Sequence, residues 1–468
     1  MRNPMFVYDE EMADLIFGYC RERLALDPVP LDYGGYSTPL HDVLDGLISP
    51  DGNEPARVLQ LFADRLATAV ISSDSPRFVS FIPAAPTKAS LLFDMVVSSS
   101  SLQATSWLEA AGAVCAENQA LGVISRLAGL PEGAGGCFVS GGSAGNLSAL
   151  MVGRDTARIR GHQTERPRFA CTEEAHSSIG KALHVLGVEP FLVAAIDHRL
   201  TGEVLEAALG SGRDGAADVV GVVATAGTTN GGIVDDLAGA GAVSRRRGLW
   251  FHVDAAYGGA ALFAPTARPL FDGVDLADSL VVDPHKWLFA PFDCAALVYR
   301  QPALAKAVHT QDAAYLDVIH EAVPGSERAA GSGAGQPNGE EPWNPTDYAY
   351  HLTRRARGLP LWFSLAVYGT NAYRDAVEAA LANAKKSAAL ISATPYLELL
   401  REPTLSIVLF RRKGWSRADY ETWSAELLAG QVAFVTPTTW EGEAAARLAL
   451  LHPDTTVDVV AEIVDSMA

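Results

Sequence analysis

The order of apolar and polar positions divides the chain into an N-terminal helical part, a long alternating part and a smaller C-terminal part. Apolar residues recur at helical spacing in residues 13–19 and 58–70, which predicts helices over residues 1 to about 75. Between them, prolines and glycines mark an extended segment that would suit an arm wrapping a partner subunit: Pro28, Pro30, Gly34, Gly35 and Pro39. We therefore expect residues 1–75 to form a helical dimerisation arm.

From about residue 76 to residue 300, short β-branched and apolar runs alternate with helical stretches. The runs are residues 136–140, 168–172, 219–225, 249–253, 279–282 and 295–299. Strands that are apolar on both faces and separated by helices are typical of a buried, mostly parallel sheet. The pattern predicts a large α/β domain over residues 76–365. A smaller α+β domain would follow over residues 366–468, with strand-like runs at residues 405–410 and 448–451.

One segment, residues 323–342, contains almost no bulky apolar residues and interrupts this alternation. A structureless stretch of this length inside an enzyme is either a lid or a disordered insert. We place it in a mobile loop over residues 312–347.

Composition and charge narrow the class of protein. The chain has 468 residues, 49% of them hydrophobic and 19% charged, which is typical of a globular enzyme. Its net charge of −19 argues against nucleic acid or an anionic membrane as a partner, since both attract basic surfaces. No apolar run has the length of a membrane span, the first residues contain no signal-peptide core, and the five cysteines lack metal-ligand spacing. We expect a soluble cytoplasmic enzyme without a metal site.

A lysine, Lys286, follows the buried run at residues 279–282 and the proline after it. Burying an unpaired ammonium is costly, but a desolvated lysine loses its proton readily and can form a Schiff base with a carbonyl cofactor. From this segment alone, a surface lysine just past a strand end is the more common alternative.

Two other segments place polar groups at the ends of predicted strands. Residues 139–150, VSGGSAGNLSAL, run from a strand through glycines into a helix, so the amides near Gly141 and Gly142 could bind an anion. A simple glycine turn is the alternative. His176 follows the strand at residues 168–172, where a side chain can meet a ligand. A structural histidine is the alternative there.

The fourth segment ends a buried strand with an acid, Asp254, followed by two alanines. A buried carboxylate needs a cationic partner, and a protonated pyridine nitrogen would provide one. Ala256 would let a flat ring lie close. Anion cradle, imidazole, carboxylate and lysine, in that order at strand ends, are the groups that pyridoxal phosphate requires.

These segments resemble the group II pyridoxal-phosphate-dependent amino-acid decarboxylases, the family of aromatic-L-amino-acid, glutamate, histidine and cysteine-sulfinate decarboxylases, and in particular its bacterial-type members. The matching stretches are GGSAGNLSAL, EEAHSSIGKA, VATAGTTNGGIVDDL, WFHVDAAYGG, DPHKWLFAPFDC and ARLALLHP. The resemblance extends from about residue 30 to residue 465, and the pair HVDAAY and PHKW is its most specific part. It implies fold-type I, the aspartate-aminotransferase-like architecture, and a homodimer with the active site at the subunit interface.

The resemblance also implies roles for individual residues in the α-decarboxylation of an L-amino acid through an external aldimine and a quinonoid. Lys286 would form the internal aldimine, Asp254 would pair with the ring nitrogen, and His176 would stack on the ring and orient the substrate carboxylate. Further cofactor contacts would come from Gly142, Ser143, Ala144, Thr229, Ala256, Asp283 and His285, with Asp235 and Arg447 as supporting groups.

A tyrosine followed by leucine on a mobile loop resembles the family's proton donor, and here the match is Tyr315. Tyr348 and Tyr350 are weaker candidates, and a half-buried loop tyrosine is the alternative. Relatives that replace this tyrosine tend to react with oxygen and release aldehydes. Tyr315 therefore argues against the alternative of oxidative deamination to an aldehyde.

Two positions depart from the family's pattern. Asp283 stands where many relatives carry asparagine near the phosphate, so we expect it to turn away or to pair with His285. The substrate pocket is expected to be smaller and more polar than in aromatic-specific relatives, with Gln103 and Thr105 contributed across the interface. Its residues would be Ser73, Phe81, Ile82, Gln103 and Thr105. The sequence does not identify the substrate.

Two further readings remain open. Carbon–carbon lyase chemistry of the sphingosine-phosphate-lyase kind would keep the cofactor, but similarity along the whole chain argues against it. An inactive enzyme retained as a scaffold subunit is the other, and the intact lysine, aspartate, histidine and tyrosine argue against that.

Overall fold

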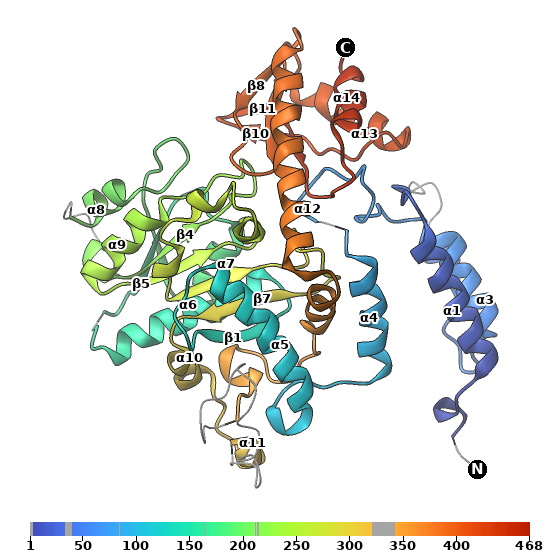
Figure 1. Cartoon of the computed structure of the whole chain (residues 1–468), viewed down its shortest axis with the longest axis horizontal. Coiled ribbons are helices and arrows are strands. Elements are labelled where there is room, and N and C mark those ends of the chain that lie inside the picture. Colours follow the sequence, from blue (N-terminus) through green and yellow to red (C-terminus); the bar gives the residue numbers. More distant parts are fainter. Residues whose placement is uncertain are drawn as a thin grey trace.

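A seven-stranded sheet forms the centre of the larger part of the chain (Figure 1). The computed structural model describes residues 3–32, 40–83, 85–162, 164–210, 212, 215–320 and 342–468, so Gly34, Gly35, Pro39 and nearly all of the segment at 323–342 lie outside the described residues. The strand order is β1-β7-β6-β5-β4-β2-β3. The bounds are β1 (Gly135–Val139), β2 (Arg168–Cys171), β3 (Glu189–Leu192), β4 (Val219–Thr225), β5 (Trp250–Asp254), β6 (Ser279–Val282) and β7 (Ala295–Tyr299).

This sheet is mostly parallel, as the sequence predicted. Only β7 runs antiparallel to its neighbours β1 and β6, and the pairs from β6 to β3 are all parallel. The six predicted runs all form strands. The strand that the pattern missed is β3, where Phe191 is the one buried residue of four. An edge strand with so little buried surface has no clear apolar signature.

Helices cover both faces of the large sheet. On one face, apolar side chains of α6 (Gly142–Ile159), α7 (Ser177–Leu186) and α10 (Pro302–His309) pack with those of the strands. On the other face lie α5 (Trp107–Leu127), α8 (Gly202–Gly210), α9 (Leu237–Arg247) and the 3-10 helix η4 (Gly258–Phe263). Side chains of β5 alternate between these two cores, with Trp250 on the α6 side and Phe251 and Val253 on the α9 side.

A smaller antiparallel sheet of order β10-β11-β9-β8 lies near the C-terminus. Its strands are β8 (Leu397–Arg401), β9 (Ile407–Arg412), β10 (Thr438–Trp440) and β11 (Glu443–Ala449), accompanied by α13 (Arg417–Ala429) and α14 (Val457–Asp465). The long α12 (Leu359–Ala393) runs from the large sheet to the small one (Figure 1) and is broken at Gly369, whose φ is +72°. The predicted boundary between residues 365 and 366 falls inside α12 and stays a prediction.

The N-terminal part forms an arm beside the body of the molecule, where α1 and α3 contact each other (Figure 1). None of the described residues in α1, α2 or α3 is buried. The bounds are η1 (Pro4–Phe6), α1 (Glu10–Ala25), α2 (Leu40–Leu44), α3 (Pro55–Leu61), the π-helix η2 (Phe62–Leu66) and α4 (Lys88–Ser99). Short helices elsewhere are η3 (Ala216–Asp218), η5 (Arg268–Phe271), η6 (Val274–Leu276), α11 (Asp317–His320) and η8 (Pro345–Tyr348).

Among the described residues, no helix combines the length and the apolar character needed to cross a membrane.

Candidate active site

The carboxyl ends of β4, β5 and β6 and the starts of α6 and α7 surround a cavity of about 280 Å³. Parallel strands bring their carboxyl ends to one edge of a sheet, which is where such α/β proteins bind ligands. All four segments that the sequence singled out contribute to the cavity. Its described lining residues are Gly141, Gly142, Ser143, Asn146, His176, Ser178, Thr225, Gly227, Thr229, Asp254, Ala256, Tyr257, Asp283, His285 and Lys286.

The glycine segment forms the start of α6 at the edge of the cavity. A Cβ atom on Gly142 would lie 2.9 Å from Asp283 Oδ2 and 3.1 Å from Ala256 Cβ, so only glycine fits without displacement. The first amides of a helix have no partner within the helix and favour an anion. Gly142 and Ser143 line the cavity, and their contact with a phosphate group stays a prediction. Ala144 is not among its described lining residues, and its amide donates to the Gly141 carbonyl.

The buried carboxylate of Asp254 ends β5 and is held by two neutral donors. Its Oδ2 accepts a hydrogen bond from Asn146 Nδ2 at 2.9 Å, and its Oδ1 accepts one from the Ala256 amide at 3.1 Å. Within the described part of the chain, no lysine, arginine or histidine forms an ion pair with it. The site therefore presents a buried carboxylate that has no cationic partner in the described part of the chain.

His176 caps the N-terminus of α7 with its side chain. Its Nδ1 accepts a hydrogen bond from the Ser178 amide at 3.2 Å and lies 2.8 Å from Ser178 Oγ. These contacts fix the orientation of the ring at the cavity, so His176 is both a structural cap and a residue of the site.

Lys286 reaches the cavity from the turn after β6. Its Nζ lies 3.0 Å from Asp283 Oδ2, and His285 Nε2 lies 3.5 Å from the same oxygen. Asp283 does not turn away, therefore, and it pairs with His285 as expected, but its nearer partner is the lysine. His285 Nδ1 accepts a hydrogen bond from the Cys294 amide at 3.0 Å. Burial lowers the pKa of His285, and the positive charge of the nearby Lys286 lowers it further.

The supporting groups Asp235 and Arg447 are not among the described residues that line the cavity. Asp235 accepts hydrogen bonds from the Thr225 and Leu200 amides, both at 2.7 Å, and so holds the end of β4. Its burial raises its pKa to about 7. Arg447 donates to the Phe81 carbonyl at 3.0 Å, and burial lowers its pKa to about 10.

In a single chain, the predicted substrate-pocket residues and the predicted proton donor lie outside the cavity. None of the described residues that line the cavity is Ser73, Phe81, Ile82, Gln103, Thr105 or Tyr315. Gln103 Nε2 donates to Glu109 Oε1 at 2.8 Å, and the Tyr315 side chain points outward, with 71% of its surface exposed. Of the weaker candidates, Tyr348 is buried against Trp343 with ring centroids 4.3 Å apart, and Tyr350 is exposed.

Sequence analysis did not single out Asn146, Ser178 or Tyr257, which also line the cavity. The signal for Asn146 is an amide side chain among small and apolar residues of a helix that packs on the sheet. Asn146 is almost completely buried, and a buried amide requires polar partners.

Comparison with known proteins gives one consistent family. A family model described as the pyridoxal-dependent decarboxylase conserved domain matches residues 41–413. The chain is 27% identical to an aromatic-L-amino-acid decarboxylase of Bacillus atrophaeus, over 97% of this chain and 94% of that protein. It is 31% identical to an L-2,4-diaminobutyrate decarboxylase of Rhizobium meliloti (strain 1021), over 81% of this chain and 74% of that protein. The solved structure of Oryza sativa TDC with PLP and tryptamine has the same fold, with a TM-score of 0.86 at 22% identity over 100% of this chain and 99% of the other.

Proposed function

Since this chain belongs to the pyridoxal-dependent decarboxylase family, we propose that the cavity lined by Lys286, Asp254 and His176 is its active site. The chain is a carboxy-lyase that uses pyridoxal phosphate to convert an L-amino acid to the corresponding amine and CO₂. One observation carries the assignment of the site: residues from four segments, spread from residue 141 to residue 286, line a single cavity.

The residues at this cavity fit the cofactor in three respects. The start of α6, where a Cβ on Gly142 would collide with its neighbours, suits a phosphate group. The buried Asp254 carboxylate suits a protonated ring nitrogen, and the Lys286 amine suits an aldehyde. Bound there, pyridoxal phosphate would supply an electron-withdrawing ring that accepts the electron pair left on the substrate Cα when CO₂ departs.

The remaining chemistry belongs to side chains of this protein. Asp254 would stabilise a positive charge on the ring nitrogen. His176, oriented by Ser178, would lie against the ring and position the substrate carboxylate. Lys286 Nζ would bind the cofactor as the free amine, and Asp283 Oδ2 lies 3.0 Å from it.

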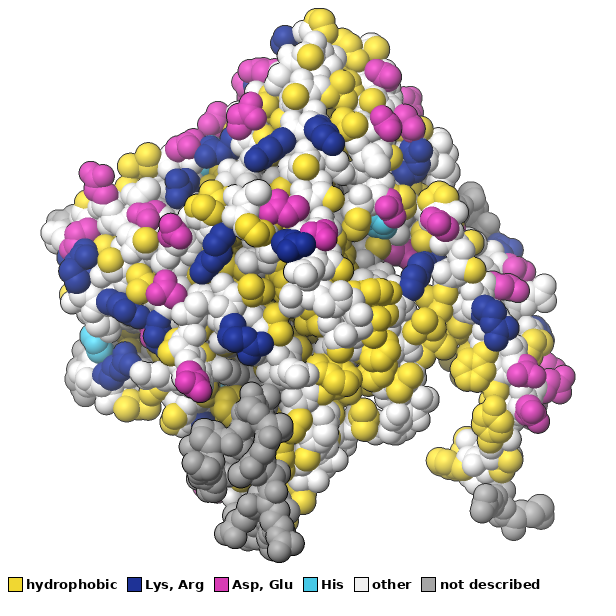
Figure 2. Space-filling view, viewed as in Figure 1, with side chains coloured by type: hydrophobic (Ala, Val, Ile, Leu, Met, Phe, Trp, Pro, Cys, Tyr) yellow, Lys and Arg dark blue, Asp and Glu magenta, His cyan; other side chains and the backbone are white. Residues whose placement is uncertain are grey.

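The homodimer is part of this proposal, and the exposed arm supports it. Helix α1 exposes Met12, Leu15, Ile16 and Phe17, and α4 exposes Leu92 and Val96. Figure 2 shows apolar side chains on the arm and on the part of the body that faces it. Large exposed apolar patches of this kind mark interaction surfaces. A second copy of this chain is the occupant we propose, because the predicted contributors Gln103, Thr105 and Tyr315 lie outside the cavity of a single chain.

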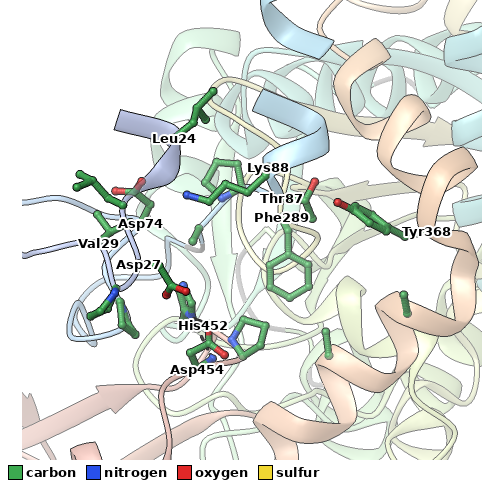
Figure 3. Close-up of a pocket in the computed structure, with 18 of the residues that line it drawn as sticks. Leu24, Asp27, Val29, Asp74, Thr87, Lys88, Phe289, Tyr368, His452 and Asp454 are labelled. Carbon is green, nitrogen blue, oxygen red and sulfur yellow. Dashed lines mark hydrogen bonds and ion pairs between the residues drawn. The ribbon is translucent and has the colours of Figure 1, made fainter. Parts of the chain in front are cut away.

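A groove of about 610 Å³ separates the end of the arm from the body. Figure 3 shows Leu24 and Val29 of the arm on one side and Phe289 and Tyr368 of the body on the other. The groove has a mostly apolar lining and is continuous with the exposed arm, so we propose that the partner subunit covers this region. Replacing Phe17 by glutamate would then give monomers in light-scattering chromatography. An unchanged dimer would contradict this surface assignment.

The substrate is an amino acid, and we propose that its side chain is smaller or more polar than an aromatic ring. The polar Gln103 and Thr105 support this if they reach the partner's cavity, whereas Phe81 would favour an apolar substrate. Incubating the enzyme with each of the twenty amino acids and identifying the amines formed tests the proposal. Exclusive conversion of an aromatic amino acid would contradict it.

The cysteines support a cytoplasmic location, which we also propose. All five are free thiols, and Cys137, Cys171 and Cys294 are buried. Burial raises the pKa of Cys137 to about 12 and that of Cys171 to about 11, so these thiols stay protonated. Unpaired cysteines are typical of a reducing compartment.

The test of the active-site assignment is the Lys286→Ala variant. Purified wild-type protein should show the visible absorption of the bound cofactor, and the variant should lose both this absorption and all turnover. Lys181→Ala, at an exposed lysine of α7, is the matched control and should retain both. Full activity in the Lys286 variant would overturn the assignment.

A further inference from the structure

Asp254 stands at the end of a series of buried hydrogen bonds that joins α6 to β5 and β6. Asn146 Nδ2 lies 2.9 Å from Asp254 Oδ2, and Asn146 Oδ1 lies 2.9 Å from His252 Nε2. His252 Nδ1 lies 2.8 Å from Ser279 Oγ, which accepts a hydrogen bond from Trp250 Nε1 at 2.9 Å. Asn146 is 1% exposed and His252 is 0% exposed, so water cannot replace these contacts.

The direction of each proton in this series follows from the carboxylate. An ionised Asp254 can only accept, so the Asn146 side chain must direct its NH₂ group to it. The Asn146 oxygen then accepts from His252 Nε2, and His252 Nδ1 accepts the hydroxyl proton of Ser279. Burial lowers the pKa of His252 to about 4, so the imidazole is neutral and has one N–H to give. Asp254 is thereby oriented without being neutralised.

The same amide group of Asn146 reaches the histidine of the site. Asn146 Nδ2 lies 3.0 Å from Ser178 Oγ, and that hydroxyl lies 2.8 Å from His176 Nδ1. The two hydrogens of this NH₂ group therefore make two different hydrogen bonds. One goes directly to the Asp254 carboxylate, and the other goes to the Ser178 hydroxyl, which contacts the His176 imidazole.

We propose that Asn146, held by His252, is a positioning residue that fixes Asp254 and His176 relative to each other, so that both meet the same cofactor ring. The inference rests on the roles given to Asp254 and His176 in the proposed function. Without the His252 contact, the Asn146 amide could rotate and present its oxygen to the carboxylate. Two acceptors would then face each other in a buried site, which is costly.

The experiment compares His252→Leu with His252→Gln in the holoenzyme. Glutamine can place an N–H near the position of Nε2 and donate to Asn146, whereas leucine leaves Asn146 Oδ1 without a partner. We expect His252→Leu to bind pyridoxal phosphate roughly 10- to 100-fold more weakly and to lower kcat by a similar factor. For His252→Gln, the cofactor affinity and kcat should both lie within about threefold of the wild-type values. The pH midpoint of the visible absorption should shift by about one unit in His252→Leu, because the charge on Asp254 is less well stabilised.

A purely structural role for His252 predicts a different result. The control is Ser244→Ala, which removes a buried hydrogen bond to the Ala240 carbonyl in α9, on the opposite face of the sheet. It should lower the melting temperature and leave the absorption midpoint and the cofactor dissociation constant unchanged. If His252→Leu behaves like Ser244→Ala in all three measurements, the inference is overturned.

A double-mutant cycle tests whether the two residues act as one unit. The Asn146→Leu/His252→Leu variant should lose no more cofactor affinity than Asn146→Leu alone, because both changes break the same series. Losses that multiply would contradict the inference. The Asp254→Ala variant distinguishes failure of the proposed function from failure of the positioning role. Wild-type cofactor affinity and turnover in Asp254→Ala would refute the proposed function itself. A defect in Asp254→Ala combined with normal behaviour of His252→Leu would refute only the positioning role.

Discussion

Lys286 Nζ and Asp283 Oδ2 lie 3.0 Å apart, in a turn where the carboxylate also faces the start of α6. Asp283 is almost completely buried, and its Oδ1 has no hydrogen-bond partner among the described residues. The acid therefore stands between the lysine and the glycine cradle. It forms an ion pair with the lysine, and its negative charge would repel a phosphate group that enters the cradle.

Replacing Asp283 by asparagine should tighten cofactor binding by about tenfold, because the change removes a like charge beside the phosphate and supplies an N–H donor. Fluorescence titration of the protein with pyridoxal phosphate measures this directly. Asp272→Asn, at an exposed acid, is the control for the loss of one charge. Weaker binding in the Asp283 variant would show that pairing with Lys286 matters more than repulsion of the phosphate.

Gly142→Ala should weaken cofactor binding by about tenfold or more, since the added methyl group would lie 2.9 Å from Asp283 Oδ2 and 3.1 Å from Ala256 Cβ. The matched control is Gly180→Ala in α7, where a Cβ would have no neighbour within 4 Å. That change should stabilise the protein by up to about 1 kcal/mol. The dissociation constant and thermal unfolding of both variants decide the point, and equal affinity in the two variants would argue against a tight cradle at Gly142.

Tyr315→Phe should retain CO₂ release while the amine yield falls. If Tyr315 returns the proton to the substrate Cα, its loss leaves O₂ as the electron acceptor, and the products become an aldehyde, ammonia and hydrogen peroxide. An oxygen electrode combined with amine analysis measures the partition. Tyr8→Phe, at an exposed tyrosine just before α1, should behave as wild type. An unchanged ratio of amine to CO₂ in Tyr315→Phe would assign proton delivery to a different group.

His198 connects the loop before α7 to the small sheet, and its charge should make this contact dependent on pH. Its Nδ1 lies 2.6 Å from Glu174 Oε1 and its Nε2 lies 3.2 Å from Glu441 Oε1. Partial burial opposes the charged form, but the hydrogen bonds to both glutamates outweigh it and raise the pKa of His198. A raised pKa in the folded state stabilises the fold below the unfolded value of about 6.5, and this contribution is lost as the pH rises through the folded pKa.

His198→Gln should therefore lower the free energy of unfolding by about 1 kcal/mol or less near pH 5.5 and have little effect near pH 9. Thermal melts across this range test the sign of the dependence. His184→Gln, at an exposed histidine of α7, is the control. A destabilisation that grows with pH would contradict the assigned direction.

The fold followed from the sequence because the strands of the large sheet are buried on both faces. In β4, all seven residues are buried, and such runs stand out from the helical pattern between them. The positions of Gly142, Asp254 and Lys286 followed too, since parallel strands bring their carboxyl ends to one edge. In β11, the predicted run 448–451 captured only the end of a strand that starts at Glu443, because its first residues are partly exposed.

The contacts between site residues could not be predicted in the same way. Asn146 and Asp254 are 108 positions apart, and nothing in the local pattern of either residue identifies the other as its partner. The pairing of Asp283 with Lys286 depends on how the turn after β6 directs two side chains three residues apart. Gln103 and Tyr315 do not line the cavity of a single chain, and nothing in the local pattern of either residue indicated this.

The burial of His252 also limits how this sequence can change over time. An imidazole with no exposed surface needs an acceptor at position 146 and a donor at position 279, and Asp254 needs a donor from that same position 146. A substitution at one of these four positions leaves a partner unsatisfied unless the new side chain makes the same hydrogen bonds or another position changes with it. We therefore expect residues 146, 252, 254 and 279 to vary together among related decarboxylases rather than one at a time.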